Sequence, residues 1–267
     1  MPAARLIHRT ALALMLAVSL VASASTAFAQ APKAPAGYEP KSGQEGKDVV
    51  WVPTPQVVVD KMLDLAKVTK NDFVMHLGSG DGRTVITAAK RGARAMGVEY
   101  NPDMVELSKR NAAKEGVTAR ASFVKADLFE TDFSRASVIT MFLLPDINLK
   151  LRPKILVLKP GTRIASNTFT MADWQADEKV TLTPEQGCDT SWCTALFWIV
   201  PAKVAGTHKL PQGELVLKQE FQMLSGALTT EGKTFALEGR VRGEDLTITA
   251  GGKTYNGRMN GKSLELR

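Results

Sequence analysis

The chain has 267 residues, of which 44% are hydrophobic and 23% are charged, as in a soluble protein long enough to bury a core. Its formal net charge is +7, but only 6% of its residues are aromatic, and the basic residues are scattered along the chain. A nucleic-acid-binding surface would need a basic stripe with stacking aromatic side chains. We therefore predict no nucleic-acid partner, although attraction to anionic surfaces stays open.

The first 29 residues have the features of a secretory signal peptide. Arg5 and Arg9 precede a short apolar run, residues 11–22, and Ala27-Phe28-Ala29 has the form of a signal-peptidase site. The apolar run is short for a bilayer span, so an uncleaved anchor is the weaker alternative. We predict an exported protein, periplasmic or secreted, with no membrane span after cleavage.

Residues 30–47 are rich in Pro, Ala, Gly and Lys, which predicts a flexible leader. After it, Thr54 is a suitable N-cap and Pro55 a suitable first residue for a helix. Because this helix precedes the first strand, the loop with Pro53 and Thr54 is expected near the glycine turn that follows. There it either covers a ligand or only begins the helix.

The stretch 73–83 predicts a strand, a tight turn and the start of a helix. Gly78, Gly80 and Gly82 stand at every second position, where glycines allow positive φ and the close approach of a ligand to the backbone. A dinucleotide-binding turn reads G-x-G-x-x-G, whereas this one reads G-x-G-x-G. A turn that needs glycines only for steric reasons would look the same.

Two acidic residues follow at the ends of the next two expected strands. Glu99 ends the strand 95–98, about 20 residues after the first glycine, where a carboxylate is placed to accept hydrogen bonds from ribose hydroxyls. Asp127 follows the next apolar run, residues 121–124. The three strand ends would line one crevice, where ligands of open α/β sheets bind. Each acidic residue alone could be a solvated residue or a cap, but the ordered set favours a ligand site.

Helices and strands continue to alternate after Glu99, which predicts right-handed crossovers and a parallel sheet. Pro153 should kink or split the helix expected from 146 to 158. The continuous apolar run 137–144 is typical of a central strand buried on both faces. The expected elements are a helix from 102 to 114 with Asn101 as its cap, a strand at 137–144, a helix from 146 to 158 and a strand at 162–167.

Residues 178–183 and 193–200 then form two strands with no helix between them, and Cys188 and Cys193 lie in their loop. Two cysteines in an exported protein are expected to pair. A metal site would need more ligands than these and the chain's 3 His provide, and the spacing is not C-x-x-C. We predict a structural disulfide and no metal site.

From residue 207 onward apolar and polar residues alternate, and Gly, Asp and Asn clusters recur at intervals of roughly ten residues. This pattern predicts a small C-terminal antiparallel β-meander, residues 207–267. A unit of this size is expected to pack on the main domain or on another chain.

The glycine turn, Glu99 and Asp127 resemble the class I S-adenosylmethionine (SAM)-dependent methyltransferases. More narrowly, Val52-Pro53-Thr54-Pro55, Leu77-Gly78-Ser79-Gly80-Asp81-Gly82-Arg83 and Val98-Glu99-Tyr100-Asn101-Pro102 resemble a group of protein-lysine methyltransferases. Mitochondrial members of that group modify the ATP synthase c-subunit and the adenine nucleotide translocase. The resemblance covers about 49–201. It implies an α/β fold for residues 48–203, a Rossmann-like seven-stranded sheet that is mostly parallel with an antiparallel last strand.

The resemblance also implies SAM as the cofactor and a set of residues that hold it. The glycines would pass under the methionine part, Glu99 would hold the ribose and Asp127 the adenine. The family usually has an acidic residue in place of His76, and a neutral His offers the amino group no counter-charge. No catalytic residue is assigned, because methyl transfer depends mainly on proximity and orientation. The expected cofactor-binding residues are Pro53, Thr54, His76, Gly78, Ser79, Gly80, Asp81, Gly82, Glu99, Tyr100, Asp127 and Leu128.

The expected function is therefore SAM-dependent methyl transfer to a protein, at a lysine side chain. SAM is made in the cytoplasm, so an exported enzyme would need it delivered. Two alternatives follow from this: a non-catalytic binding module for SAM or another nucleoside-like ligand, and an interaction protein that uses the C-terminal meander. The sequence predicts neither the methyl acceptor nor the oligomeric state.

Overall fold

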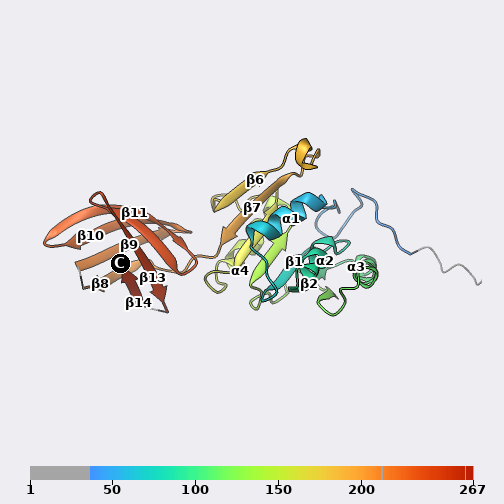
Figure 1. Ribbon diagram of the computed structural model, residues 1–267, viewed down its shortest axis with the longest axis horizontal. Helices are drawn as coiled ribbons and strands as arrows, with labels where there is room; N and C mark the ends of the chain where they lie inside the picture. Colours follow the sequence, from blue (N-terminus) through green and yellow to red (C-terminus); the bar gives the residue numbers. More distant parts are fainter. Residues whose placement is uncertain (1–36, 212, 262, 267) are drawn as a thin grey trace, which may run out of the picture. The chain divides into compact units, whose positions relative to one another are not determined.

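The computed structural model describes residues 37–211, 213–261 and 263–266, which form two seven-stranded sheets with their helices and loops (Figure 1). The expected signal peptide and the first residues of the expected leader lie outside this range. Within it, no helix is long and apolar enough to cross a membrane.

The first sheet has the strand order β3-β2-β1-β4-β5-β7-β6. Its first five strands in the chain pair in parallel, and β7 runs antiparallel to both β5 and β6. The predicted fold class, a mostly parallel sheet with an antiparallel last strand, is confirmed. The strands are β1 (Phe73–Leu77), β2 (Arg94–Glu99), β3 (Ala121–Lys125), β4 (Val138–Met141), β5 (Arg163–Asn167), β6 (Glu178–Thr181) and β7 (Thr194–Ile199).

Apolar layers cover both faces of this sheet, as the continuous apolar strands predicted. On one face Val74 and Val138 pack with residues of α1, α2 and α3. On the other face Met75 and Ile139 pack with residues of α4. The helices are α1 (Gln56–Leu65), α2 (Arg83–Lys90), α3 (Pro102–Lys114) and α4 (Pro145–Ile155), with a short 3₁₀ helix η1 (Pro184–Gln186) before β7.

The helix ends follow the sequence signals in α3 but not in α1 and α4. Asn101 caps α3 as predicted, since its side chain accepts a hydrogen bond of 2.9 Å from the Asp103 N–H. The prediction of Thr54 as the N-cap of α1 is wrong: Pro55 is the capping residue, with ψ of 139°. The fixed φ of proline suits extended backbone as well as helix, so it does not decide the helix start. Pro153 does not split α4, which ends within the same turn at Ile155.

The second sheet is the predicted meander, since each strand pairs antiparallel with the next. Its end strands β8 and β14 contact each other. Its buried side chains, among them Leu215, Leu228, Val241 and Ile248, therefore form a core of their own. The strands are β8 (Gly206–Leu210), β9 (Gly213–Glu220), β10 (Met223–Thr230), β11 (Lys233–Arg242), β12 (Asp245–Ala250), β13 (Lys253–Asn260) and β14 (Ser263–Leu266).

Contacts also connect this sheet with the first one. The Phe221 ring stacks on the Trp174 ring at a centroid distance of 6.1 Å. The Arg242 guanidinium lies 2.6 Å from the Glu178 carboxylate. The second sheet thus combines its own core with an aromatic and an ionic contact to the segment around β6.

Candidate functional site

A pocket opens at the carboxyl ends of β1 to β4, above the turn that joins β1 to α2. It encloses about 920 Å³ of empty space, its open mouth included. Gly82 and Asp127 do not contribute to the lining that the described residues form. The predicted residues that do line the pocket are Pro53, Thr54, His76, Gly78, Ser79, Gly80, Asp81, Glu99, Tyr100 and Leu128.

The glycine turn has the positive φ values that its spacing predicts. Gly80 has a φ of 55° and Gly82 a φ of 85°, in a region that residues with a Cβ rarely adopt. A Cβ on Gly80 would lie 2.5 Å from Nε1 of Trp51, and one on Gly82 would lie 2.9 Å from the Phe123 ring. Gly80 therefore lets Trp51 pack directly on the turn, whereas Gly82 is required by packing at the start of α2.

Arg83 ties the loop before α1 to this turn. Its Nη2 lies 2.6 Å from Oδ2 of Asp81, and its Nη1 donates a hydrogen bond of 3.0 Å to the Thr54 carbonyl. The predicted approach of the loop with Pro53 and Thr54 to the glycine turn is thus observed. The charge of Asp81 is balanced within the turn itself.

The Glu99 carboxylate is held at the end of β2 by two backbone groups. Oε2 accepts a hydrogen bond of 2.9 Å from the Gly80 N–H, and Oε1 accepts one of 3.0 Å from the Asn101 N–H. Each carboxylate oxygen accepts two hydrogen bonds, so each keeps one acceptor position for a ligand. Both positions belong to a side chain that lines the pocket, and adjacent hydroxyls of a ribose would suit them.

Ser79 places a buried hydroxyl without a partner in the same lining. The residue is 4% exposed, and its Oγ makes no hydrogen bond to any residue that the structure describes. Leaving such a group unpaired costs about 1–3 kcal/mol, so a polar ligand group would stabilise it. A ligand rich in hydroxyl and amino groups, such as SAM, fits the unpaired Ser79 Oγ and the anchored Glu99.

His76 lies in β1 below the turn and is 4% exposed. Its Nδ1 is 2.8 Å from Oγ1 of Thr140 in β4. Burial lowers the pKa of His76 from 6.5 to about 4, so the ring is neutral at neutral pH. The pocket has no negative charge at this position, and the neutral ring is engaged with the neighbouring strand.

Asp127 is occupied by a residue of the expected leader. Its Oδ2 accepts a hydrogen bond from the Lys47 ammonium, and its Oδ1 accepts one of 2.9 Å from the Phe129 N–H. The hydrogen bond from Lys47 lowers the pKa of Asp127 and raises that of Lys47. Lys47 Nζ also lies 4.7 Å from the centre of the Tyr100 ring. The carboxylate predicted to hold adenine thus pairs with a cation that lines the pocket.

Lys47 belongs to a segment that covers the pocket, residues 44–52, here named the leader strap. Every residue of the strap lines the pocket. Backbone hydrogen bonds hold it in a loop, from Gly43 N–H to the Trp51 carbonyl at 2.8 Å and from Trp51 N–H to the Gln44 carbonyl at 2.9 Å. Neither Lys47 nor Trp51 was predicted as a site residue, because no local sequence pattern signals contacts of this kind.

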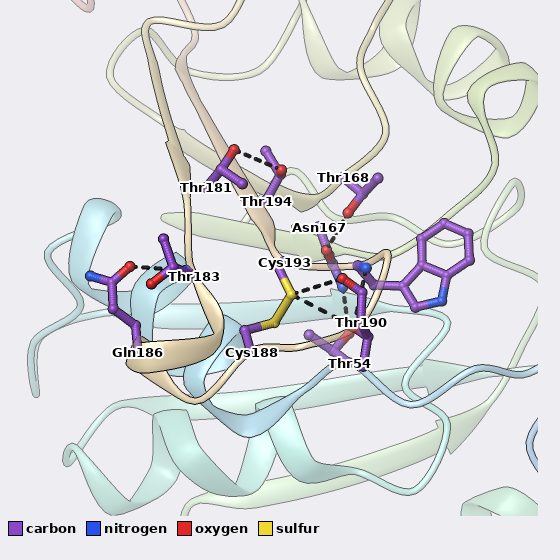
Figure 2. The surroundings of a disulfide bond; sticks show 11 residues. Thr54, Asn167, Thr168, Thr181, Thr183, Gln186, Cys188, Thr190, Cys193 and Thr194 are labelled. Carbon is purple, nitrogen blue, oxygen red and sulfur yellow. Dashed lines mark hydrogen bonds between the residues drawn. A yellow bond between two sulfur atoms is a disulfide. The ribbon is translucent and has the colours of Figure 1, made fainter.

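The predicted disulfide between Cys188 and Cys193 is confirmed (Figure 2). Both cysteines are buried, and they pack with Val58 and Met62 of α1. Nearby, the Asn167 Nδ2 at the end of β5 is 3.5 Å from Oγ1 of Thr54, which lines the pocket. The disulfide loop therefore lies on the β5 side of the site. In the described part of the chain, no His, Cys, Asp and Glu side chains are grouped to hold a metal ion.

Comparison with known proteins gives matches over the first sheet. Residues 76–178 match the family model of the ANTKMT methyltransferase domain. A protein-lysine N-methyltransferase from Saccharolobus islandicus is 48% identical over 135 residues, which are 49% of this chain and 84% of that protein. The human lysine N-methyltransferase of the ATP synthase c-subunit is 33% identical over 53% of this chain, and the match spans only 59% of the human protein.

A solved structure gives a similar result. The crystal structure of an RNA methyltransferase from Salinibacter ruber, in complex with S-adenosyl-L-homocysteine, has a TM-score of 0.52 and 43% sequence identity to this chain. The match covers 57% of this chain and 96% of the other. The matches thus span most of the archaeal relative and nearly all of the chain in this structure. The chain belongs to the family of methyltransferases that includes these protein-lysine N-methyltransferases, and its cofactor is SAM.

Proposed function

We propose that this enzyme methylates the side-chain nitrogen of lysine in a protein. The observation that carries the proposal is the 48% identity to an archaeal protein-lysine N-methyltransferase over 84% of that protein's length. The pocket fits the cofactor half of this function, since Glu99 would hold the ribose and Ser79 would gain a partner. When bound, SAM supplies an activated methyl group.

An RNA acceptor is the competing assignment, because the related Salinibacter ruber structure is that of an RNA methyltransferase. The charges around the pocket favour a protein acceptor. Lys47 and Arg83 line the pocket, and each is paired with a carboxylate, Asp127 and Asp81 respectively. A bound RNA would need cations available for its phosphates. No nucleic acid is therefore proposed as a partner.

We place this activity outside the cytoplasm, on the strength of the signal-peptide pattern in residues 1–29. The disulfide supports this placement, because disulfides persist in oxidising compartments. The acceptor would then be a lysine of an exported or membrane-associated protein.

Titration calorimetry with SAM tests the cofactor site. The wild-type protein should bind SAM, and Glu99→Ala should bind it at least about tenfold more weakly, because hydrogen bonds to a charged group contribute roughly 1.5–3 kcal/mol. Glu130→Ala removes an exposed carboxylate outside the pocket lining and serves as the control. Equal affinity of the Glu99 and Glu130 variants would contradict the assigned role of Glu99. SAM binding without methyl transfer to any protein would favour the binding-module alternative.

A further inference from the structure

Three aromatic side chains from three different segments meet beside the pocket. Phe142 follows β4, Phe169 follows β5 and Trp192 lies in the disulfide loop before β7. The ring centroids are 5.8 Å apart for Phe142 and Phe169, 5.5 Å for Phe142 and Trp192, and 5.6 Å for Phe169 and Trp192. Each ring therefore contacts both of the others. These three residues are named the aromatic wall.

The aromatic wall is not part of the protein's cores. Each of its three side chains is only half-buried, and none of them belongs to the apolar clusters that the described residues form. Large aromatic residues that gather at the surface next to a pocket often mark a binding site. We therefore expect a ligand to cover this cluster.

The position of the aromatic wall along the sheet edge indicates which ligand covers it. Asp127 follows β3 and Glu99 ends β2, at one end of the strand order, whereas Phe142 and Phe169 follow β4 and β5 on the other side of β1. Phe142 itself lines the pocket. If Glu99 and Asp127 hold the nucleoside, as the proposed function requires, the aromatic wall stands at the opposite end of the pocket. The acceptor must approach from that end.

We propose that the aromatic wall is the entry site for the acceptor lysine. A lysine side chain is a four-carbon apolar stem with a cationic end, and it packs its stem on apolar surface. Aromatic faces attract an ammonium group through their quadrupoles. The wall offers both kinds of contact within one cluster. This inference rests on the proposed function, and it assigns the acceptor side of the same site.

The disulfide fixes the part of the wall that comes from a loop. Trp192 directly precedes Cys193, which is bonded to Cys188. The backbone N–H of Trp192 donates a hydrogen bond of 3.2 Å to Oγ1 of Thr190. Both cysteines are anchored on α1. A half-exposed Trp on a short loop is thus held in place by a covalent closure, which reduces the entropy lost when a lysine binds.

A bisubstrate probe tests this inference separately from the cofactor site. The probe is an adenosine whose 5′ nitrogen bears the amino-acid chain of SAM and, through a two-carbon linker, an amine that carries a four-carbon alkyl stem. Its affinity, measured by calorimetry, is compared with that of S-adenosylhomocysteine, which lacks the amine chain. The wild-type protein should bind the probe about tenfold more tightly, as expected for a packed stem with a cation–π contact.

Trp192→Ala and Phe169→Ala should each lose most of this advantage, while their affinity for S-adenosylhomocysteine stays within about twofold of wild type. Phe235→Ala, which truncates a half-buried aromatic residue of the second sheet, is the matched control and should keep the advantage. Normal binding of S-adenosylhomocysteine also shows that a variant is folded. If the Trp192 variant does not fold, the Phe169 variant gives the same test at the segment that follows β5.

Two results would overturn the inference in distinguishable ways. S-adenosylhomocysteine binding with no gain for the probe, or with a gain that both wall variants keep, would contradict the aromatic wall and leave the proposed function standing. Failure of the wild-type protein to bind S-adenosylhomocysteine at all would overturn the proposed function, and the inference with it.

Discussion

At the scale of single residues, His76 is the least expected member of the site. The resemblance implies an acidic residue here, and the structure has a buried, neutral imidazole whose Nδ1 meets Oγ1 of Thr140. Because burial lowers the pKa of His76 to about 4, the ring is uncharged in the folded protein wherever the pH is near neutral. His76 thus contributes shape and one hydrogen bond rather than charge, and the chain must hold the cofactor's amino group by other means.

This burial predicts a pH-dependent stability. The unfolded chain protonates His76 near pH 6.5 and the folded chain only near pH 4, so the unfolded state binds more protons between these values. Stability from this residue is therefore complete above pH 6.5 and is lost as the pH falls to 4. The loss amounts to about 3 kcal/mol in the free energy of unfolding.

Urea unfolding between pH 4 and pH 7.5 measures the effect, with His76→Gln as the comparison. The wild-type free energy of unfolding should fall across this range more steeply than that of the variant. Burial raises the pKa of Asp72, but its hydrogen bonds lower it further, so the net shift is downward. Its contribution to stability is therefore lost only at lower pH. Because Asp72 is present in both proteins, it does not affect their comparison. Parallel pH profiles would show that His76 is not buried in its neutral form.

At the scale of elements, the leader strap decides how open the cofactor pocket is. It covers the glycine turn with Trp51 and pairs Lys47 with Asp127, a residue that lies 80 positions further along the chain. An adenine amino group and the Lys47 ammonium are both hydrogen-bond donors, and they would compete for the same carboxylate. The strap is therefore a built-in competitor at the adenine end of the pocket.

Replacing Lys47 should consequently tighten cofactor binding. Lys47→Met keeps an apolar stem beside the Tyr100 ring and releases Asp127, so the Kd for SAM should fall by roughly threefold to tenfold. Lys41→Met, at an exposed position that precedes the leader strap, should leave the Kd unchanged. Weaker binding by the Lys47 variant would mean that Lys47 closes over the bound cofactor instead of competing with it.

The elements also show which features of the site could be predicted from the sequence and which could not. Glu99 and Asp127 were predicted because strand ends in a parallel sheet converge at one edge, a rule that depends only on periodicity. The same rule points to Phe142, which follows β4. Lys47, Trp51 and the meeting of Trp192 with Phe169 depend on how loops fold back over the sheet, and no local pattern encodes those long-range contacts. Thr54 was misassigned as a cap because Pro55 suits two backbone conformations.

At the scale of the whole molecule, the second sheet has a core of its own and also contacts the first. Trp174 is fully buried, and the Phe221 ring that stacks on it comes from the turn between β9 and β10. The meander therefore shields apolar surface of the methyltransferase region. None of the residues described in the meander lines the cofactor pocket.

Deleting residues 207–267 should therefore lower the stability of the remaining chain without removing the cofactor site. Loss of the Phe221 contact exposes Trp174, and each 1 kcal/mol lost lowers the melting temperature by about 2–4 °C in a domain of this size. The variant Phe221→Ser in the full-length protein shows how much of this change in melting temperature comes from the aromatic contact alone. A truncated protein that melts at the wild-type temperature and stays soluble would show that the meander does not stabilise the first sheet.

The central claim is that this chain transfers methyl groups to lysine, and mass spectrometry tests it most directly. The purified protein is incubated with SAM carrying a trideuterated methyl group and an extract of exported proteins and RNA, and both fractions are digested and analysed. We expect trideuteromethyl groups on lysine side chains with the wild-type protein, and several-fold fewer of them with Glu99→Ala when SAM is limiting. Label on RNA nucleosides alone, or no label in either fraction although SAM binds, would contradict the account.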